Sequence, residues 1–246
     1  MSIPVGHVEV PERVHRLVGD APFVADPPIE AVWRNEVGGT TFFSPVHGAY
    51  VKWAPAGTPV DLAEESRRLR WVARFTRVPE VLDVGSDDEG AWLMTRAVPG
   101  RSAVHPAWLA RPEDAVRAVG AGLRAFHESV PVAGCPYDWG VEVRRASAPD
   151  PAAVDALGPP PPVDRLVVCH ADACVPNTLL DDDGRWLAHV DLGRCGVADR
   201  WADLAVATWS TEWNYGPGYE EPLLEAYGID PDDERTAYYR ALWDLT

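Results

Sequence analysis

Three short apolar runs in the second half of the chain predict three neighbouring strands. The first, Leu166–Cys169, has the length and residue types of a buried strand. Two more, Thr178–Leu180 and residues 186–190, are joined by residues 181–185, where Asp and Gly favour a tight turn. The pattern therefore predicts a strand, a polar loop over residues 170–177, and then a β-hairpin.

The first hundred residues alternate apolar and polar positions in a way that predicts a strand-rich segment. Residues 31–53 read as a β-hairpin or meander, with a Pro-His-Gly turn at residues 45–48. Further strands are predicted at residues 81–82 and 91–95. Residues 61–75 instead repeat apolar positions at helical spacing, so one helix interrupts the strands.

The remainder of the chain is dominated by helical periodicity. Helices are predicted at residues 112–129, 199–210, 220–227 and 233–245. Four consecutive prolines at residues 159–162 exclude a helix interior there, because proline lacks the backbone donor and clashes with the preceding turn.

Composition limits the class of protein. The 246 residues are 46% hydrophobic and 24% charged, which allows one large domain or two small lobes. No apolar run approaches the roughly 20 residues needed to cross a bilayer, and residues 1–10 lack a secretion-signal pattern, so we expect a cytoplasmic protein without membrane contact. The four cysteines form no CxxC pair, which argues against zinc or redox chemistry and predicts free thiols.

The formal net charge of −16 makes nucleic acids and anionic membranes poor partners. Such a surface would steer a cationic small molecule towards it. Charge alone, however, is equally explained by solubility, and it becomes informative only beside a chemical site.

The loop and hairpin bring three metal- and proton-binding side chains together. A hairpin closes on itself, so Asn177 before its first strand and Asp191 after its second are expected to meet, with Asp172 on the same loop as Asn177. Carboxylate and amide oxygens suit Mg²⁺ that also holds substrate phosphates. A further carboxylate can orient an attacking hydroxyl and take its proton, so the set predicts phosphoryl transfer. A solvated acidic hairpin is the alternative.

Two features of the first half fit phosphate binding. Gly38 and Gly39 precede Thr40 and Thr41, and this Gly-Gly-Thr-Thr segment fits a loop whose backbone closes over phosphates, although paired glycines also form ordinary turns. Lys52 alternates with apolar neighbours on a predicted strand, where it could grip phosphates or simply face solvent.

The exact residues of the loop and hairpin are more specific than their pattern of apolar and polar positions. CHADACVPNTLL followed by HVDLGRCGVADRWADLAVAT closely resembles the aminoglycoside 3'-phosphotransferases, which are antibiotic kinases. The resemblance covers nearly the whole chain. It implies an α+β, two-lobed protein-kinase-like fold, with a nucleotide-binding lobe at residues 1–97 and a larger helical, catalytic lobe at residues 98–246.

The resemblance also implies roles for individual residues. Asp172 is the expected catalytic base, and Asn177 and Asp191 the Mg²⁺ ligands. Lys52 and its partner Glu65 would position the phosphates of ATP, with GTP as an alternative donor.

The same resemblance assigns residues to the nucleotide base and to the substrate. Met94 and Ala97 would lie at the adenine. Arg194 would balance charge near Asp172 or the phosphates, while Asp244 and the carboxylate of Thr246 match groups that bind substrate amines. The chain is expected to be a monomer or a weak dimer.

Several departures leave the acceptor open. Residues 142–164 form a short, proline-rich substitute for a longer acidic insertion, and Trp209 stands where an arginine is usual, so an aromatic wall could replace a cationic brace. Thr246 replaces the usual terminal aromatic residue.

The main hypothesis is a kinase of an aminoglycoside hydroxyl that gives resistance. The alternatives are a kinase of another antibiotic, nucleoside or metabolite, and a non-catalytic nucleotide-binding protein.

Ala171 replaces the glycine of the family's H-G-D motif. If this residue requires a positive φ, alanine costs about 1 kcal/mol there, and if φ is negative nothing is lost. Activity is expected in either case.

Overall fold

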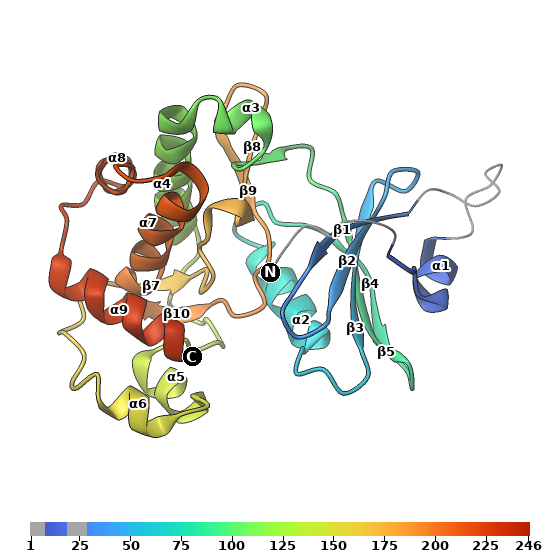
Figure 1. Ribbon diagram of the computed structural model, residues 1–246, viewed down its shortest axis with the longest axis horizontal. Coiled ribbons are helices and arrows are strands. Elements are labelled where there is room, and N and C mark those ends of the chain that lie inside the picture. Colours follow the sequence, from blue (N-terminus) through green and yellow to red (C-terminus); the bar gives the residue numbers. More distant parts are fainter. Residues whose placement is uncertain (1–7, 19–28) are drawn as a thin grey trace. The chain divides into compact units, whose positions relative to one another are not determined.

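The computed structural model describes residues 8–18 and 29–246, and these residues divide into two compact units (Figure 1). The N-terminal unit comprises Met1–Ala73 and Pro79–Val98, and the C-terminal unit comprises Arg74–Val78 and Pro99–Thr246. The sequence shows no secretion-signal pattern in residues 1–10, and most of these residues lie outside the described part of the chain. The predicted division into a nucleotide-binding lobe at residues 1–97 and a catalytic lobe at residues 98–246 concerns function, and it remains a prediction.

The described residues of the N-terminal unit form an antiparallel sheet with two helices. Its strands have the order β1-β2-β3-β5-β4. Their bounds are β1 Glu30–Arg34, β2 Thr40–Ser44, β3 Ala49–Pro55, β4 Val81–Ser86 and β5 Gly90–Arg96, with helices α1 Glu12–Val18 and α2 Leu62–Val72. Phe42, Val51 and Trp53 of the central strands belong to its apolar core. The meander predicted for residues 31–53 is thus present, with a turn at residues 45–48.

Helix α2 follows the central strand and contacts β4 and β5. The Asp61 carboxylate caps its N-terminus by accepting a hydrogen bond from the backbone N–H of Glu64 at 2.7 Å. The helix ends at Val72, three residues before the predicted end at residue 75, because residues 73–75 form a turn.

The C-terminal unit is mainly helical, with small sheets among its helices. Strands β6 Arg101–Ser102, β8 Thr178–Leu180 and β9 Trp186–His189 form one sheet, and β7 Leu166–Cys169 pairs antiparallel with β10 Gly196–Asp199. The helices are α3 Pro106–Leu109, α4 Pro112–Ser129, α5 Val141–Ser147, α6 Pro151–Asp155, the 3-10 turn η1 Val175–Asn177, α7 Trp201–Tyr215, α8 Glu220–Tyr227 and α9 Asp233–Leu245.

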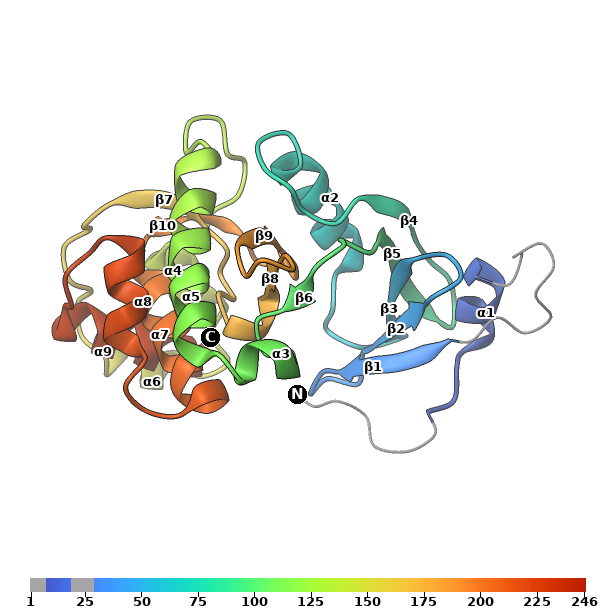
Figure 2. The ribbon, with the colours of Figure 1, turned by 90° about the horizontal axis from the view of Figure 1, so that it is seen from above.

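Close backbone approaches set the position of α4. Helix α4 runs beside α8 (Figure 2), and a Cβ placed at Gly120 would come within 2.3 Å of the Leu223 carbonyl oxygen. A Cβ at Gly122 would lie 2.4 Å from the Trp186 ring at the start of β9. Glycine at both positions therefore lets α4 support the hairpin that carries the predicted metal ligands.

Both boundaries predicted for the helix at residues 199–210 are wrong. Asp199 ends strand β10, α7 begins at Trp201, and α7 continues to Tyr215. The Asp199 carboxylate accepts hydrogen bonds from the backbone N–H groups of Trp201, at 3.0 Å, and Asp164, at 2.8 Å. These bonds fix Asp199 ahead of the helix, because a side chain that caps backbone donors sits outside the helical turn.

The proline-rich segment is partly helical. Two short helices, α5 and α6, occupy residues that the sequence left unassigned, while residues 159–162 are not helical, as predicted. Among the described residues, none of the helices combines the length and apolarity needed to span a membrane.

Candidate active site

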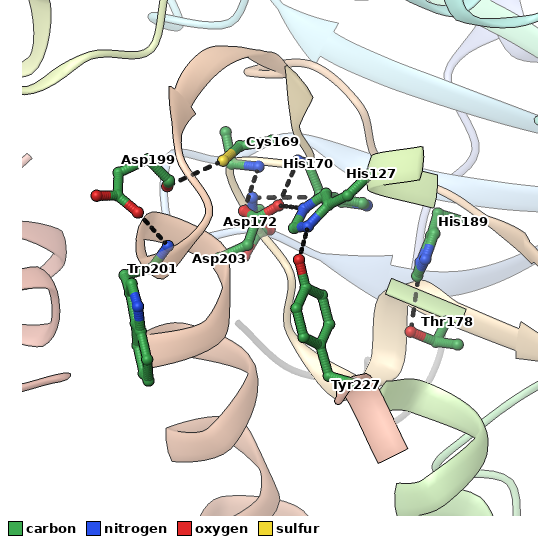
Figure 3. Close-up of polar contacts among 11 residues, drawn as sticks. His127, Cys169, His170, Asp172, Thr178, His189, Asp199, Trp201, Asp203 and Tyr227 are labelled. Carbon is green, nitrogen blue, oxygen red and sulfur yellow. Dashed lines mark hydrogen bonds and ion pairs between the residues drawn. The ribbon is translucent and has the colours of Figure 1, made fainter. Parts of the chain in front are cut away.

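The loop that joins β7 to β8 is held by one buried carboxylate (Figure 3). Asp203, on the first turn of α7, accepts hydrogen bonds from the backbone N–H of His170 at 2.6 Å and of Ala171 at 2.8 Å. The His127 ring contacts the same carboxylate at 2.9 Å. Two consecutive backbone donors on one side chain fix the course of the loop immediately before Asp172.

The surroundings of Asp203 keep its carboxylate charged. Burial alone would raise the pKa of Asp203, but hydrogen bonds and positive charge from His127 hold that pKa below its usual value. The other nitrogen of His127 contacts the Tyr227 hydroxyl at 2.9 Å. His127 and Asp203 therefore have structural roles, because they hold the backbone of this loop in place.

His170 connects the loop to the far end of the hairpin. Its Nε2 donates to the carbonyl of Val190 at 2.8 Å, and its Nδ1 accepts from the backbone N–H of Asp172 at 3.3 Å. Val190 precedes Asp191, and its own N–H donates to the carbonyl of Asn177 at 3.0 Å. The two ends of the hairpin are thus joined, as the spacing predicted.

Asp172 and Asn177 interact directly. The Asn177 amide nitrogen donates to the backbone carbonyl of Asp172 at 3.0 Å and to its Oδ2 at 3.1 Å. The other carboxylate oxygen, Oδ1, is buried without a hydrogen-bond partner in the part of the chain that the structure describes. With both amide hydrogens engaged, Asn177 presents only its oxygen for further binding. A buried, uncompensated carboxylate oxygen is a group that a proton-bearing ligand would satisfy.

The donor set fits magnesium. The oxygen of Asn177 and the carboxylate of Asp191 are both hard ligands of the type that Mg²⁺ uses beside phosphate. Asp191 adopts a φ of 65°, an uncommon conformation for a residue other than glycine, which is held by the bonds around the hairpin ends. These two residues could therefore hold the ion that the chemistry requires.

The N-terminal unit contains the second predicted pair. Lys52 lies on β3, and its Nζ is 2.7 Å from Oε1 of Glu65 on α2. Glu65 is only 6% exposed, so its charge is compensated chiefly by a partner rather than by water. This contact joins the central strand to the helix and fixes the direction of the lysine.

The other predicted nucleotide residues are also in this unit. Met94 is buried on β5 beside Val51, and Ala97 donates its N–H to the Gly48 carbonyl at 2.8 Å. Thr40 and Thr41 lie within β2 and not in the loop before it. Their proposed contact with phosphate remains a prediction.

The turn between β1 and β2 is organised by a single side chain. The side-chain oxygen of Asn35, Oδ1, accepts hydrogen bonds from the backbone N–H groups of Val37, at 3.2 Å, and Gly39, at 2.7 Å. Gly38 adopts a φ of 92°.

The chain terminus lies among arginines. Arg194 donates to the main-chain oxygen of Thr246 at 3.5 Å, and Arg144 donates to the Thr246 hydroxyl at 3.1 and 3.0 Å. Both guanidinium groups face the Trp139 ring, at 5.0 Å for Arg144 and 5.6 Å for Arg194. Arg194 thus places a positive charge at Thr246, whose predicted contact with a substrate amine remains a prediction, whereas Asp244 is exposed.

The sequence did not identify Arg144. It is 1% exposed on α5, and burial lowers its pKa to about 10. The contact of Arg144 with Thr246 spans 102 positions, so no local pattern in the sequence marks it.

The arginine that the motif lacks at Trp209 is supplied from another helix. Arg240 on α9 donates to the Ala205 carbonyl and the Thr208 hydroxyl, both at 3.1 Å. Its guanidinium carbon is 5.6 Å from the centre of the Trp209 ring. A cation is thus present beside α7, which corrects the expectation that this brace is missing.

Comparisons with known proteins identify the relatives of this chain. Residues 32–239 match the phosphotransferase enzyme family. The chain is 38% identical to an aminoglycoside 3'-phosphotransferase of Streptomyces fradiae, over 77% of this chain and 81% of that protein. It is 34% identical to a streptomycin 3''-kinase of Streptomyces griseus, over 88% of this chain and 91% of that protein.

Solved structures show the same fold. A type VIII aminoglycoside 3'-phosphotransferase superposes with a TM-score of 0.76 at 28% identity, covering 95% of this chain and 97% of that one. An aminoglycoside phosphotransferase of Streptomyces rimosus, in complex with ADP and streptomycin, gives a TM-score of 0.72 at 26% identity, with the same coverage. The chain belongs to the phosphotransferase enzyme family. The predicted α+β kinase-like fold is confirmed.

Proposed function

We propose that this protein transfers the γ-phosphate of a magnesium-bound nucleoside triphosphate, ATP or GTP, to a hydroxyl of an aminoglycoside. The observation that carries the proposal is the braced loop in which Asp172 contacts Asn177, at one end of the hairpin that leads to Asp191. The curated relatives named above act on aminoglycosides, and one solved relative is bound to ADP and streptomycin. Phosphorylation of such an antibiotic would give resistance.

Each residue has a physical task in this mechanism. Asp172 orients the acceptor hydroxyl and takes its proton as the new bond forms. Lys52, held by Glu65, binds the nucleotide phosphates. Asn177 and Asp191 would hold Mg²⁺, which when bound screens the charge of the phosphates. Asp203 and His170 keep the loop in place for these groups.

One observation supports a different acceptor on the same scaffold. Arg194 is 3.5 Å from the main-chain oxygen of Thr246, and Arg144 bonds the hydroxyl of the same residue. These contacts place positive charge at Thr246 and reduce the attraction of that residue for a substrate amine. A hydroxylated acceptor with fewer amines, such as a nucleoside or another antibiotic, is therefore the second candidate.

The proposal is tested by incubating the protein and Mg·ATP or Mg·GTP with streptomycin, kanamycin, a nucleoside and a neutral sugar. Mass spectrometry detects the addition of one phosphoryl group, and NMR of the product identifies the hydroxyl. We expect transfer to at least one aminoglycoside. Transfer only to the nucleoside or sugar would favour the second candidate. If nucleotide raises the thermal stability but no acceptor is phosphorylated, the protein binds nucleotide without catalysing transfer.

A further inference from the structure

Three tryptophans of the C-terminal unit form a cluster with a role that the mechanism above does not use. Trp209 and Trp213 on α7 and Trp243 on α9 contact one another, and we call them the aromatic cluster. Their ring centres are 4.9, 6.4 and 5.9 Å apart, within the range of favourable aromatic pairs. The rings are tilted by 48°, 72° and 39°, so their faces point in different directions.

The aromatic cluster is only partly covered. Trp213 is 50% exposed, although a buried position would gain more from so large an apolar side chain. Trp209 and Trp243 are half-buried. An exposed tryptophan supported by two others is a rigid face that is available to a ligand.

Helix α7, which carries two of the three rings, contacts the catalytic loop. The hydroxyl of Ser210, between Trp209 and Trp213 in sequence, accepts a hydrogen bond from the backbone N–H of Val175 at 3.0 Å. Val175 is three residues from Asp172 in the same loop. Two of the rings therefore belong to the helical turn that contacts the segment carrying the proposed base.

Helix α9 reaches the metal-binding side in the same way. Trp243 precedes Thr246 by one helical turn, and the Thr246 oxygen is 3.5 Å from Arg194. Arg194 is three residues beyond Asp191. The aromatic cluster thus belongs to elements that contact both the catalytic loop and the segment after Asp191.

The cation beside the cluster, Arg240, is balanced by Glu220, whose Oε2 accepts a hydrogen bond from its guanidinium at 2.6 Å. Trp209 already has the guanidinium of Arg240 at 5.6 Å from its ring centre, which is the geometry of a cation–π contact. The chain carries a net charge of −16, which attracts cations to the protein as a whole. A protonated amine or guanidinium on a ring is therefore the chemistry that fits the exposed face of Trp213.

We infer that the aromatic cluster binds the amine- or guanidinium-bearing ring of the phosphate acceptor, with Trp213 as its principal contact. The inference rests on the proposed function, because it assigns a specificity subsite to the same reaction. It also explains how a chain with arginines beside its terminus can still recognise a cationic substrate. The aromatic cluster then attracts the cationic ring of the substrate, which acidic groups would otherwise do.

The test measures steady-state phosphoryl transfer to streptomycin and kanamycin by wild type, Trp213→Ala and Trp213→Phe. We expect Trp213→Ala to raise the acceptor KM about tenfold, within the range of a desolvated cation–π contact. The KM for ATP and kcat should change less than twofold. Trp213→Phe should recover part of the loss, because it keeps an aromatic face.

Leu109→Ala is the matched control, since Leu109 is also an exposed apolar residue of the same unit, 43% exposed on α3. It should leave both KM values unchanged. An acceptor KM in Trp213→Ala within twofold of wild type, for an acceptor that wild type phosphorylates, overturns the inference alone. Absence of transfer by wild type to either aminoglycoside overturns the proposed aminoglycoside activity, and the inference with it.

Discussion

Asp203 accepts a hydrogen bond at 2.8 Å from the backbone N–H of Ala171, which adopts a φ of 70°. The left-handed conformation is strained for alanine by about 1–2 kcal/mol, and the buried carboxylate holds it in place. The strain allows two consecutive N–H groups to point at one side chain.

Ala171→Gly is therefore expected to leave the free energy of unfolding unchanged or to raise it by up to about 1 kcal/mol, because relief of strain offsets the lost methyl and the more flexible unfolded chain. Ala173→Gly is the control on the same loop, where φ is not positive, and it should lower stability by about 1 kcal/mol. Urea denaturation measures both. Equal losses in the two variants would contradict this account of Ala171.

The Lys52–Glu65 pair predicts a selective effect on nucleotide binding. Glu65→Gln removes the charge that holds Lys52, so the KM for ATP should rise about tenfold, in keeping with a charge-assisted hydrogen bond of about 1.5–3 kcal/mol. Glu64→Gln is the matched control, because Glu64 pairs instead with Arg67 and Arg68 on the helix surface. Its KM for ATP should stay within twofold. Similar effects in both variants would argue that Glu65 has no special role.

The metal ligands predict a change in magnesium demand. Asp191→Asn keeps the side-chain shape but removes a charge, so the Mg²⁺ concentration at half-maximal rate should rise at least tenfold. Asp182→Asn, in the hairpin turn with a side chain 89% exposed, should change it little. Rates measured against free Mg²⁺ after chelator treatment distinguish the two. An unchanged magnesium requirement in Asp191→Asn would remove Asp191 from the proposed ligand set.

A buried histidine predicts part of the acid sensitivity. Burial, with the nearby His170, lowers the pKa of His189 to about 3, whereas an unfolded histidine titrates near 6.5. Between these values only the unfolded chain binds the proton, so stability falls as pH falls, by about 1.4 kcal/mol per pH unit from this group. Above pH 7 both states are neutral and the contribution is complete.

His189→Gln should flatten this dependence. Urea unfolding of wild type and variant between pH 7 and pH 5 measures the two slopes, and the difference at pH 8 isolates the effect of packing. Parallel curves over the whole range would show that His189 does not titrate differently in the two states.

The local parts of the fold could be predicted from the sequence. Helices α4, α8 and α9 have the predicted bounds, because each carries strong periodicity and a clear start or stop, such as Pro112 in the first turn of α4 or Gly228 after α8. Helices α5 and α6 are too short for periodicity to be detected. Strand β10 pairs with β7 far earlier in the chain, so Asp199 was assigned to a helix.

The same distinction applies to the site. The closeness of the hairpin ends, where Asn177 and Val190 are joined by a backbone hydrogen bond, could be predicted from the sequence because the hairpin is local. Lys52 and Glu65 were matched through family resemblance. Arg240 was missed because its contacts with Ala205 and Thr208 cross 35 and 32 positions, and only the packing of α9 on α7 creates them.

The most direct test of the account is the rate of phosphoryl transfer by Asp172→Asn, measured in a single turnover with saturating Mg·ATP and an acceptor that wild type uses. The substitution keeps the size of the side chain but removes the group that accepts the proton. We predict a rate about 10²–10⁴-fold below wild type, with the affinity for ATP changed less than threefold. A rate within tenfold of wild type would contradict the assignment of Asp172 as the base.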